Sequence, residues 1–375
     1  MQFVWWTLAA VGAFIAWYIA GTMYLAYVLR WEDNQTIGLN YYGRSPAERA
    51  AFKRKLRLHA RLLQPLLALN SKMARVDFRR ARFTHEGISG PAGSCSADSF
   101  KRGAEYEARP EDIFVVTQMK CGTTWMQHVV YQVLHRGAGD LVERGATMYA
   151  TSPWLEGRKS VSLEDAPLVS AHCRRIIKTH FPAQLCPQSP AAKYIYVARH
   201  PVSCFASCID FVETNVGAMA PELPAYEAWF TSPELMWWGT WADHVKGWWE
   251  RAQQQDNVLF VYFEEMKRDL PAIAQKVAAF LELPPLSDTE LAHVVEKCSF
   301  AYMQKHQDNF EMQPPHILQT NAALFVSGKA DRHHDVPAEV SARIRSWAAA
   351  ALPPGHAITD VYVDLVSTTP TAVAR

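Results

Sequence analysis

The sequence predicts an α/β fold in which a parallel sheet is flanked by helices on both faces and preceded by a transmembrane helix. Three observations carry this prediction. No side chain in the first 29 residues is charged. Four buried-strand patterns alternate with helical patterns after residue 110. Polar clusters follow three of these strands, at the edge where parallel sheets bind ligands. The 375 residues suffice for one large α/β domain with accessory segments.

The first element is an apolar segment that ends at Leu29. As a helix it would be about 40 Å long, enough to cross a hydrocarbon core of about 30 Å. Trp5 and Tyr27 lie near its two ends, where aromatic side chains favour the membrane interface. A cleaved signal peptide and a buried core helix are the alternatives. The absence of a basic flank before the apolar run disfavours the signal peptide, and the length of that run disfavours a core helix. We expect a membrane anchor over residues 1–30.

A basic juxtamembrane helical region is expected over residues 31–82. Between Arg30 and Arg82 the sequence has thirteen Lys or Arg residues and four Asp or Glu residues. Positive flanks favour the cytoplasmic side, so the main domain is expected on that face of the membrane. Ser45 is a candidate N-cap before Pro46, and Pro65 is expected to end or kink the helix. The basic face of this helix either contacts anionic headgroups or packs on the domain.

The main domain is expected over residues 83–355, followed by a C-terminal tail over 356–375. It begins with a loop rich in small residues that extends to position 110. Buried strands are predicted over 113–118, 175–180, 194–200 and 258–263. Helices are predicted after the first of these strands, from Pro201, and over the stretch PAIAQKVAAFLEL. Strands that alternate with helices in this way favour a parallel sheet.

The stretch KCGTTW, from Lys120 to Trp125, joins the first strand to a helix and has the composition of a phosphate-binding loop. Gly122 permits a tight turn, and the amides that follow belong to a helix N-terminus, which attracts anions. The Walker motif GxxxxGK[ST] is absent, which disfavours an ATP-hydrolysing enzyme. A cysteine phosphatase with Cys121 as nucleophile would need an arginine six residues later, where the chain has Gln127.

The cysteines and histidines do not predict a metal site. The seven cysteines are odd in number and irregularly spaced, so we expect reduced thiols rather than a disulfide framework. No pair of CxxC motifs is present. His333, His334 and Asp335 are expected in an exposed loop. A net charge of +1 gives no reason to expect binding to nucleic acid.

Two of these segments resemble the cofactor motifs of the cytosolic-type sulfotransferases. QMKCGTTW is similar to the family's 5′-phosphosulfate loop, commonly YPKSGTTW. YIYVARHPVSCFASCIDF is similar to its 3′-phosphate motif, whose arginine and serine stand eight residues apart, as Arg199 and Ser207 do here. The resemblance covers roughly residues 108–335. It implies a P-loop-type sulfotransferase domain that uses 3′-phosphoadenosine-5′-phosphosulfate (PAPS) as co-substrate and requires no metal.

The resemblance also implies roles for individual residues. His180 would be the general base, and Lys120 and Lys178 would stabilise the charge that develops on the phosphosulfate. Trp154, in the segment TSPWLE, is a candidate contact for the acceptor. The implied co-substrate-binding residues are Lys120, Cys121, Gly122, Thr123, Thr124, Trp125, Arg199, Ser207, Ser299, Phe300, Met303 and Gly328.

The sequence departs from the family pattern at several of these positions. Cys121 replaces a frequent serine, and Phe263 stands where a tyrosine often contacts the nucleotide. The family often has RKGxxGDW, whose first glycine aligns with Gly328, whereas this chain has Val and Ser at the two charged positions, 326 and 327. Lys329 or Arg332 is a candidate replacement for that basic pair.

The acceptor is expected to carry a hydroxyl or an amine, and the anchor with its nearby aromatic residues favours a small lipophilic or membrane-resident molecule. Two other functions remain as alternatives. One is a nucleotide-binding adaptor at the membrane with weak catalysis, and the other is an NTP-dependent kinase.

Overall fold

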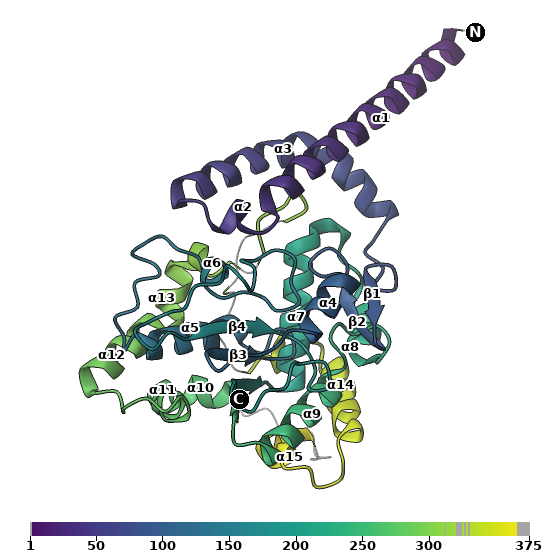
Figure 1. Ribbon diagram of the computed structural model, residues 1–375. Helices are drawn as coiled ribbons and strands as arrows, with labels where there is room; N and C mark the ends of the chain where they lie inside the picture. The colour runs from purple at the N-terminus through teal and green to yellow at the C-terminus, as the bar shows by residue number, and fades with distance from the viewer. Residues whose placement is uncertain (1, 312, 320–324, 326–327, 329–330, 366–375) are drawn as a thin grey trace.

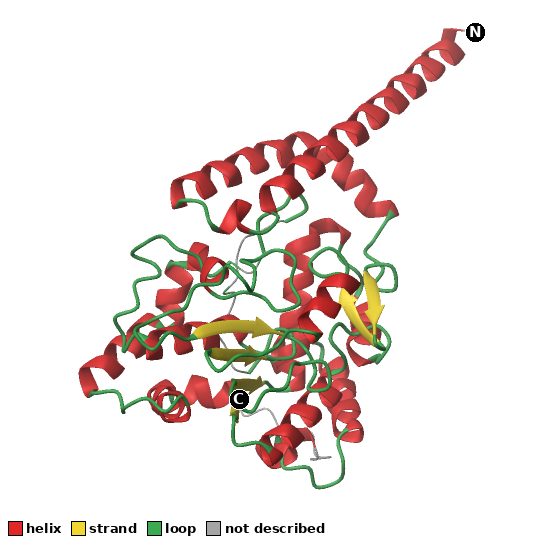
Figure 2. Ribbon diagram, viewed as in Figure 1, coloured by secondary structure: helices red, strands yellow, loops and turns green. Residues whose placement is uncertain are grey.

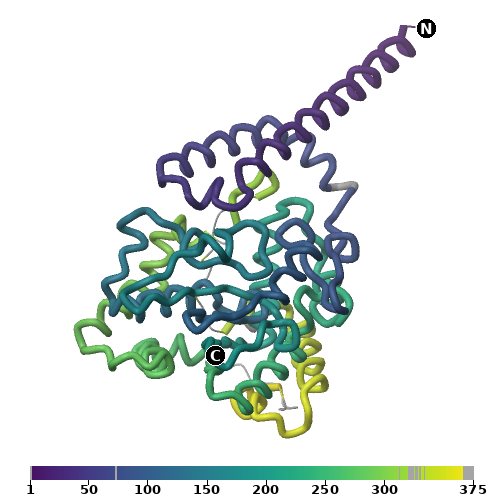
Figure 3. Tube along the Cα trace, viewed as in Figure 1, coloured from purple at the N-terminus to yellow at the C-terminus, as the bar shows by residue number. Residues whose placement is uncertain are grey.

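A computed structural model gives the fold of the chain and describes residues 2–311, 313–319, 325, 328 and 331–365 (Figure 1). A long N-terminal helix projects from an α/β domain (Figures 1 and 3). The helices are α1 (Gln2–Thr36), α2 (Leu39–Tyr42), α3 (Pro46–Met73), α4 (Ala97–Ala104), α5 (Thr123–Leu134), α6 (Met148–Thr151), α7 (Pro201–Val216), α8 (Leu223–Thr231), α9 (Trp241–Gln254), α10 (Phe263–Arg268), α11 (Leu270–Phe280), α12 (Asp288–Lys297), α13 (Phe300–Lys305), α14 (Ala338–Ala351) and α15 (Ile358–Val361). Short 3₁₀ turns η1 to η4 occupy Gly217–Met219, Gln307–Asn309, His333–Asp335 and Val363–Leu365.

The central sheet consists of β3 (Asp112–Val116), β4 (Arg175–Thr179), β5 (Lys193–Ala198) and β6 (Val258–Tyr262), in the order β4-β3-β5-β6. Every pairing between neighbouring strands is parallel. The four predicted strands are confirmed, each within two residues of its expected bounds. Because the strands are parallel, the segments that follow them meet at one edge of the sheet. A separate antiparallel hairpin joins β1 (Arg82–His85) to β2 (Ile88–Pro91), within the stretch expected as a loop.

Helices cover both faces of the sheet, as predicted (Figure 2). α5 packs on β3 and β4, while α9 and α10 pack on β6. The strands are buried, and several of their side chains are aromatic. The rings of Phe114 and Tyr194 stack at 4.9 Å between centroids, and those of Tyr196 and Trp248 stack at 5.6 Å. The polar side chains of the strands lie at their ends: Asp112, Arg175 and Lys193 begin their strands, and Lys178 and Thr179 end β4.

The N-terminal helices form a pair that stands against one side of the domain (Figure 1). α1 is long and apolar enough to cross a membrane by length and composition, and none of its most apolar 18-residue window is buried. α3 begins with the predicted Ser45 cap, which here is a capping box with Glu48. Pro65 does not end this helix, which continues to Met73. The Ser45 box stabilises the start of the helix, and the packing of α3 against α1 offsets the hydrogen bond that Pro65 removes.

Polar contacts fix the helix pair to the domain. The carboxylate of Glu32, near the end of α1, accepts a hydrogen bond from the Ile317 amide at 3.0 Å. The Tyr41 hydroxyl donates to Glu311 at 2.6 Å, and the Lys53 ammonium pairs with the same carboxylate. Glu311 and Ile317 are therefore held between the α1–α3 pair and the domain.

The segment expected as a C-terminal tail packs on the domain as far as it is described, to Leu365. The Tyr362 hydroxyl donates to Glu264 at 2.9 Å, and Asp364 pairs with His200 at 3.1 Å. Both partners follow strands of the central sheet, so this segment supports the carboxyl edge from outside.

Candidate active site

The loop between β3 and α5 has the backbone that a phosphate cradle requires. Gly122 caps α5 with φ of 101°, a conformation that strongly favours glycine. A Cβ at this position would lie 2.8 Å from the ring of Phe263, so a larger residue would also collide with that ring. Lys120 has φ of 65°, an unusual left-handed conformation for a long side chain, which is often found at functional sites. The loop thus presents the first amides of α5, which the helix itself does not use.

His180 follows β4 and is oriented by two hydrogen bonds. Its Nδ1 lies 2.9 Å from the carbonyl oxygen of Thr117, which can only accept, so Nδ1 carries the proton. The lone pair of the neutral ring is therefore on Nε2. The His180 carbonyl in turn accepts from Nε2 of His244 at 2.9 Å, and the Tyr196 hydroxyl lies 3.0 Å from the other ring nitrogen of His244. The Thr117 contact holds the imidazole in one tautomer, and the His244 contact fixes the backbone at the end of β4.

Burial lowers the pKa of His180 well below its usual value, and the positive charge of Lys178 lowers it further. The imidazole is therefore neutral at physiological pH, as a general base must be. The buried carboxylate of Glu156 accepts from the His180 amide at 2.8 Å and from the Thr179 hydroxyl at 2.8 Å. Glu156 was not predicted as a site residue, yet it holds the end of β4 in place.

Lys178 points from β4 into the same region. Its ammonium donates to the Tyr149 hydroxyl at 2.8 Å and lies 3.7 Å from the centre of the Trp154 ring. Burial lowers its pKa to about 7, with the charge of Lys120 acting in the same direction and that of Glu156 opposing it. An anion that binds beside Lys178 stabilises its charged ammonium form. A lysine with a lowered pKa therefore favours the binding of an anion.

Lys120, Lys178 and His180 line one small cavity, so the structure brings the three predicted catalytic residues together. Trp154, predicted as an acceptor contact, lines it as well. The remaining lining residues are Pro91, Ser94, Met119, Phe211, Trp238 and Gln313. The cavity walls are mainly apolar apart from the two cations and the imidazole. Such a site can hold an anion next to an apolar molecule whose proton His180 removes.

The predicted nucleotide side begins at Arg199, which follows β5. Its guanidinium donates to the Lys120 carbonyl at 3.0 Å and stacks on the ring of Phe263 at 4.3 Å. Phe263 also packs edge-on against Trp125, with 5.5 Å between ring centroids. The Trp125 indole donates to the Cys298 carbonyl at 2.8 Å. Phe263 thus takes part through its ring, although it lacks the hydroxyl of the family's tyrosine.

The other predicted nucleotide-binding residues lie on α7 and near α13. Ser207 is half-buried on α7, and Ser299 uses its hydroxyl to cap α13 through the Tyr302 amide at 3.2 Å. Gly328 has φ of 60° and lies against Phe300, since a Cβ there would be 2.6 Å from that ring. Cys121 and Met303 are buried in the core, and Thr123 and Thr124 are buried in the first turn of α5.

Lys329 and Arg332 are the two candidates that could replace the basic pair before Gly328. Lys329 lies outside the described residues. Arg332 is buried and pairs with Asp210 at 2.5 Å and with Asp335 at 2.6 Å. With two carboxylates on one guanidinium, Arg332 is already neutralised and does not supply a net positive charge for a phosphate.

The charge distribution fits a polyanionic nucleotide. In the described part of the chain no carboxylate oxygen lies within 4.0 Å of the ammonium of Lys120 or Lys178. The helix N-terminus at Gly122 adds a partial positive charge beside them. The aromatic group of Trp125, Phe263 and Phe300 provides flat apolar surface for a base. PAPS would be held by these residues, with its sulfuryl group as the part that is transferred.

The cysteines of this region are thiols. Cys121 and Cys204 are buried with 3.6 Å between their sulfur atoms, and all seven cysteines are free. Among the described residues no group of three or more His, Cys, Asp or Glu side chains is arranged to hold a metal ion.

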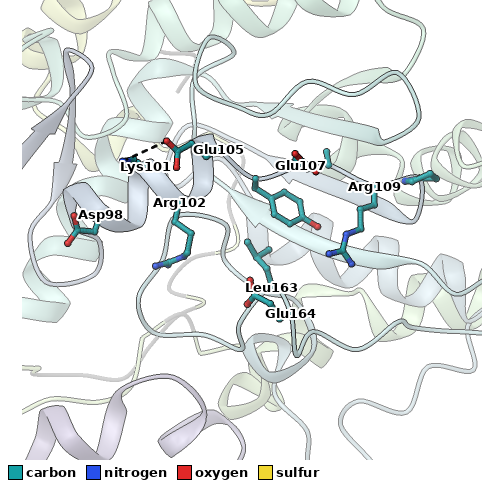
Figure 4. A pocket seen from close by; sticks show the side chains of 11 residues that line it. Asp98, Lys101, Arg102, Glu105, Glu107, Arg109, Leu163 and Glu164 are labelled. Atoms are coloured by element: carbon teal, nitrogen blue, oxygen red, sulfur yellow. Dashed lines mark ion pairs between the residues drawn. The ribbon is translucent and has the colours of Figure 1, made fainter.

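A second hollow lies outside this site, between α4 and the segments around residues 105–110 and 163–164 (Figure 4). It is open and lined by charges of both signs, and Lys101 and Glu105 pair across its wall at 4.0 Å. It contains none of the predicted site residues and has no excess of positive charge for a nucleotide.

Several site residues were not predicted from the sequence. Tyr149, Glu156, Phe211, Trp238 and Gln313 come from loops and helices that are distant in the sequence. Only Trp238 carries a backbone signal, a φ of 62° in the cluster of tryptophans, and that signal is visible only in the structure.

Comparisons with known proteins identify the family of the chain. Residues 110–352 match the model of the sulfotransferase domain family. Sulfotransferase 2B1 of Mus musculus is 31% identical over 271 residues, which cover 69% of this chain and 78% of that protein. Sulfotransferase 1C2 of Homo sapiens is 30% identical over 218 residues, covering 56% of this chain and 72% of that protein.

Solved structures show the same fold. The crystal structure of mouse sulfotransferase SULT7A1 complexed with PAP has a TM-score of 0.58 at 21% identity and covers 77% of this chain and 100% of its own. Retinol dehydratase in a complex with retinol and PAP gives 0.59 at 19% identity, covering 75% and 96%. The chain therefore belongs to the sulfotransferase family and is an enzyme that transfers a sulfuryl group from PAPS to an acceptor.

Proposed function

We propose that this sulfotransferase acts at a membrane and sulfates a hydroxyl or amine of a small lipophilic acceptor. The single observation that carries the transfer itself is the meeting of Lys120, Lys178 and His180 in one cavity. His180 Nε2 removes the acceptor proton as the acceptor attacks sulfur, and the two lysines stabilise the negative charge on the departing phosphate. The apolar lining by Met119, Phe211 and the tryptophans supports a lipophilic acceptor.

The contacts of α1 support a retained anchor rather than a cleaved signal sequence. The Tyr18 hydroxyl donates to Asn70 at 2.8 Å, and Gly21 lies against Leu66, where a Cβ would be 3.2 Å from the leucine side chain. Removal of residues up to 30 would expose the apolar side of α3 that these contacts cover. The first half of α1, by contrast, is exposed along its length, and its Phe3, Trp5 and Trp6 side chains are suited to a membrane.

The basic flank supports an orientation with the domain in the cytoplasm, where PAPS is made. The exposed side of α3 carries Arg54, Lys55, Arg57 and Arg61 together with Leu58 and Leu62, a composition suited to an anionic lipid surface. In sealed vesicles with the cytoplasmic face outward, added protease should digest the domain without detergent. Protection of the domain until detergent is added would contradict this orientation.

The proposed function is tested by comparing the nucleotides that the full-length protein binds in detergent. Calorimetric titration should show binding of 3′-phosphoadenosine-5′-phosphate (PAP) and weaker binding of ATP–Mg²⁺, and PAPS with a panel of lipophilic alcohols and amines should yield PAP. Preference for ATP–Mg²⁺ would favour the kinase. Binding of PAP without turnover by any acceptor would favour the adaptor.

Lys178 predicts a pH dependence of PAP binding. Its pKa of about 7 in the free protein means that the ammonium loses its proton as the pH rises through 7. A bound phosphate favours the charged form, so binding above pH 7 requires uptake of a proton. Affinity for PAP should fall between pH 7 and 9, by up to about tenfold per unit of pH, which is the limit for one proton.

Calorimetry in buffers of different ionisation enthalpy measures this uptake directly. The Lys178→Met variant should bind PAP more weakly at pH 7 but without the proton uptake, and its affinity should change little up to pH 9. His180 does not contribute in this range, because its pKa is well below neutral. Equal uptake in the wild type and in Lys178→Met would assign the proton to another group.

A further inference from the structure

Lys267 is a cation at the nucleotide side of the site that no prediction included. It lies in the last turn of α10, which follows β6 directly and therefore starts at the carboxyl edge of the sheet. It stands four residues after Phe263, so both side chains project from the same side of the helix. Phe263 is the ring that packs on Arg199, on Gly122 and on Trp125.

The ammonium of Lys267 lies between the aromatic residues expected to hold the base. It is 5.7 Å from the ring centre of Trp125 and 5.7 Å from that of Phe300. Its charge is also close enough to Arg199 that the guanidinium lowers the pKa of Lys267, although partial burial has the larger effect. The two positive charges therefore lie beside the same group of aromatic rings, Arg199 over Phe263 and Lys267 near Trp125 and Phe300.

The neighbouring carboxylates do not neutralise Lys267. Glu264 accepts from the His200 amide at 3.1 Å and from the Tyr362 hydroxyl at 2.9 Å. Glu265 accepts from the Tyr262 amide at 3.4 Å in the capping box of α10. In the described part of the chain, no carboxylate oxygen lies within 4.0 Å of the Lys267 ammonium. Lys267 therefore keeps its positive charge available to an anionic ligand, and that charge would attract a phosphate.

We propose that Lys267 binds the 3′-phosphate of PAPS together with Arg199 and supplies the positive charge that Val and Ser at 326 and 327 do not provide. Arg332 cannot take this role, because Asp210 and Asp335 already neutralise it. A lysine on α10 can reach the phosphate as a point charge, while the planar Arg199 is held in position by Phe263 and by the Lys120 carbonyl. The inference rests on the proposed use of PAPS by this site.

The test compares two nucleotides that differ only in the 3′-phosphate, namely PAP and AMP, by calorimetric titration of the full-length protein at fixed salt. Lys267→Gln should weaken PAP binding about tenfold, as for loss of a charged hydrogen bond, and change AMP binding less than about twofold. Lys267→Arg keeps the charge and should retain most of the PAP affinity. Lys276→Gln, an exposed lysine on α11, is the matched control and should change neither.

The outcomes distinguish a failure of this inference from a failure of the proposed function. An equal loss for PAP and AMP in Lys267→Gln would place Lys267 at the base or the 5′-phosphate and overturn the inference. So would unchanged affinity for both nucleotides. Failure of the wild-type protein to bind PAP would instead contradict the proposed function. Because Lys267 is exposed, the variant should fold, and an unchanged melting temperature would verify this.

Discussion

Replacement of His180 by Asn is expected to lower kcat/KM by about a thousandfold while leaving the affinity for PAP nearly unchanged. The expected size lies within the range of about 10²–10⁴ that a positioned general base contributes. His180 is the only imidazole that lines the cavity in the described part of the chain, and its free Nε2 is the atom that can take the acceptor proton. Loss of that nitrogen should slow proton removal without altering the lysines that bind the anion.

Asn is the appropriate replacement because its amide can still donate to the Thr117 carbonyl, as Nδ1 of His180 does at 2.9 Å. The local structure should therefore persist while the base is lost. His128, which is equally buried but packs against Phe310 outside the cavity, provides the comparison: His128→Asn should leave the catalytic constants of the folded protein near those of the wild type. A His180→Asn enzyme with unchanged kcat would show that another group accepts the proton.

The sequence was sufficient to predict the sheet and one edge of the site. Each strand is a run of apolar residues bounded by turns, and Lys120, His180 and Arg199 each follow a strand within a few residues. Because parallel strands end at one edge, proximity in space follows from position in the chain for these residues. The capping box at Ser45 is a local pattern of the same kind, and it was also predicted correctly.

The parts that could not be predicted depend on contacts between distant segments. Glu156 supports His180 from 24 positions away, and nothing in its own surroundings indicates a buried carboxylate. The role of Arg332 was left open because its partner Asp210 lies 122 positions earlier, on α7. Pro65 is a related case, because the local rule leaves open whether a proline ends or kinks a helix, and here the helix continues to Met73.

Replacement of Lys120 by Met should also have a large effect, this time on both the chemical step and binding. We expect kcat/KM to fall by about 10²–10³, as when one stabilising group for a developing negative charge is removed. Lys120 lies beside the cradle, with its ammonium 4.9 Å from the ring of Phe211, and burial lowers its pKa. PAP affinity should fall as well, by roughly tenfold, because the phosphate loses one cation.

Met keeps an unbranched side chain that is only one atom shorter, and the backbone carbonyl that accepts from Arg199 remains in place. The left-handed backbone at position 120 is equally strained with either residue, so stability should change little. Lys101→Met, on the exposed surface of α4, is the matched control and should behave like the wild type. Turnover with PAPS and titration with PAP measure the two effects separately.

A second consequence distinguishes an electrostatic role of Lys120 from a merely structural one. The positive charge of Lys120 contributes to the low pKa of Lys178, which is about 7. Lys120→Met removes that charge, so the pKa of Lys178 should rise. The Lys178 ammonium should then stay protonated up to a higher pH. The midpoint of proton uptake on PAP binding should then move above pH 7, although PAP binds more weakly. If the midpoint stays near pH 7 in Lys120→Met, the charge of Lys120 does not influence the pKa of Lys178. The joint role assigned to the two lysines in the transfer would then be wrong.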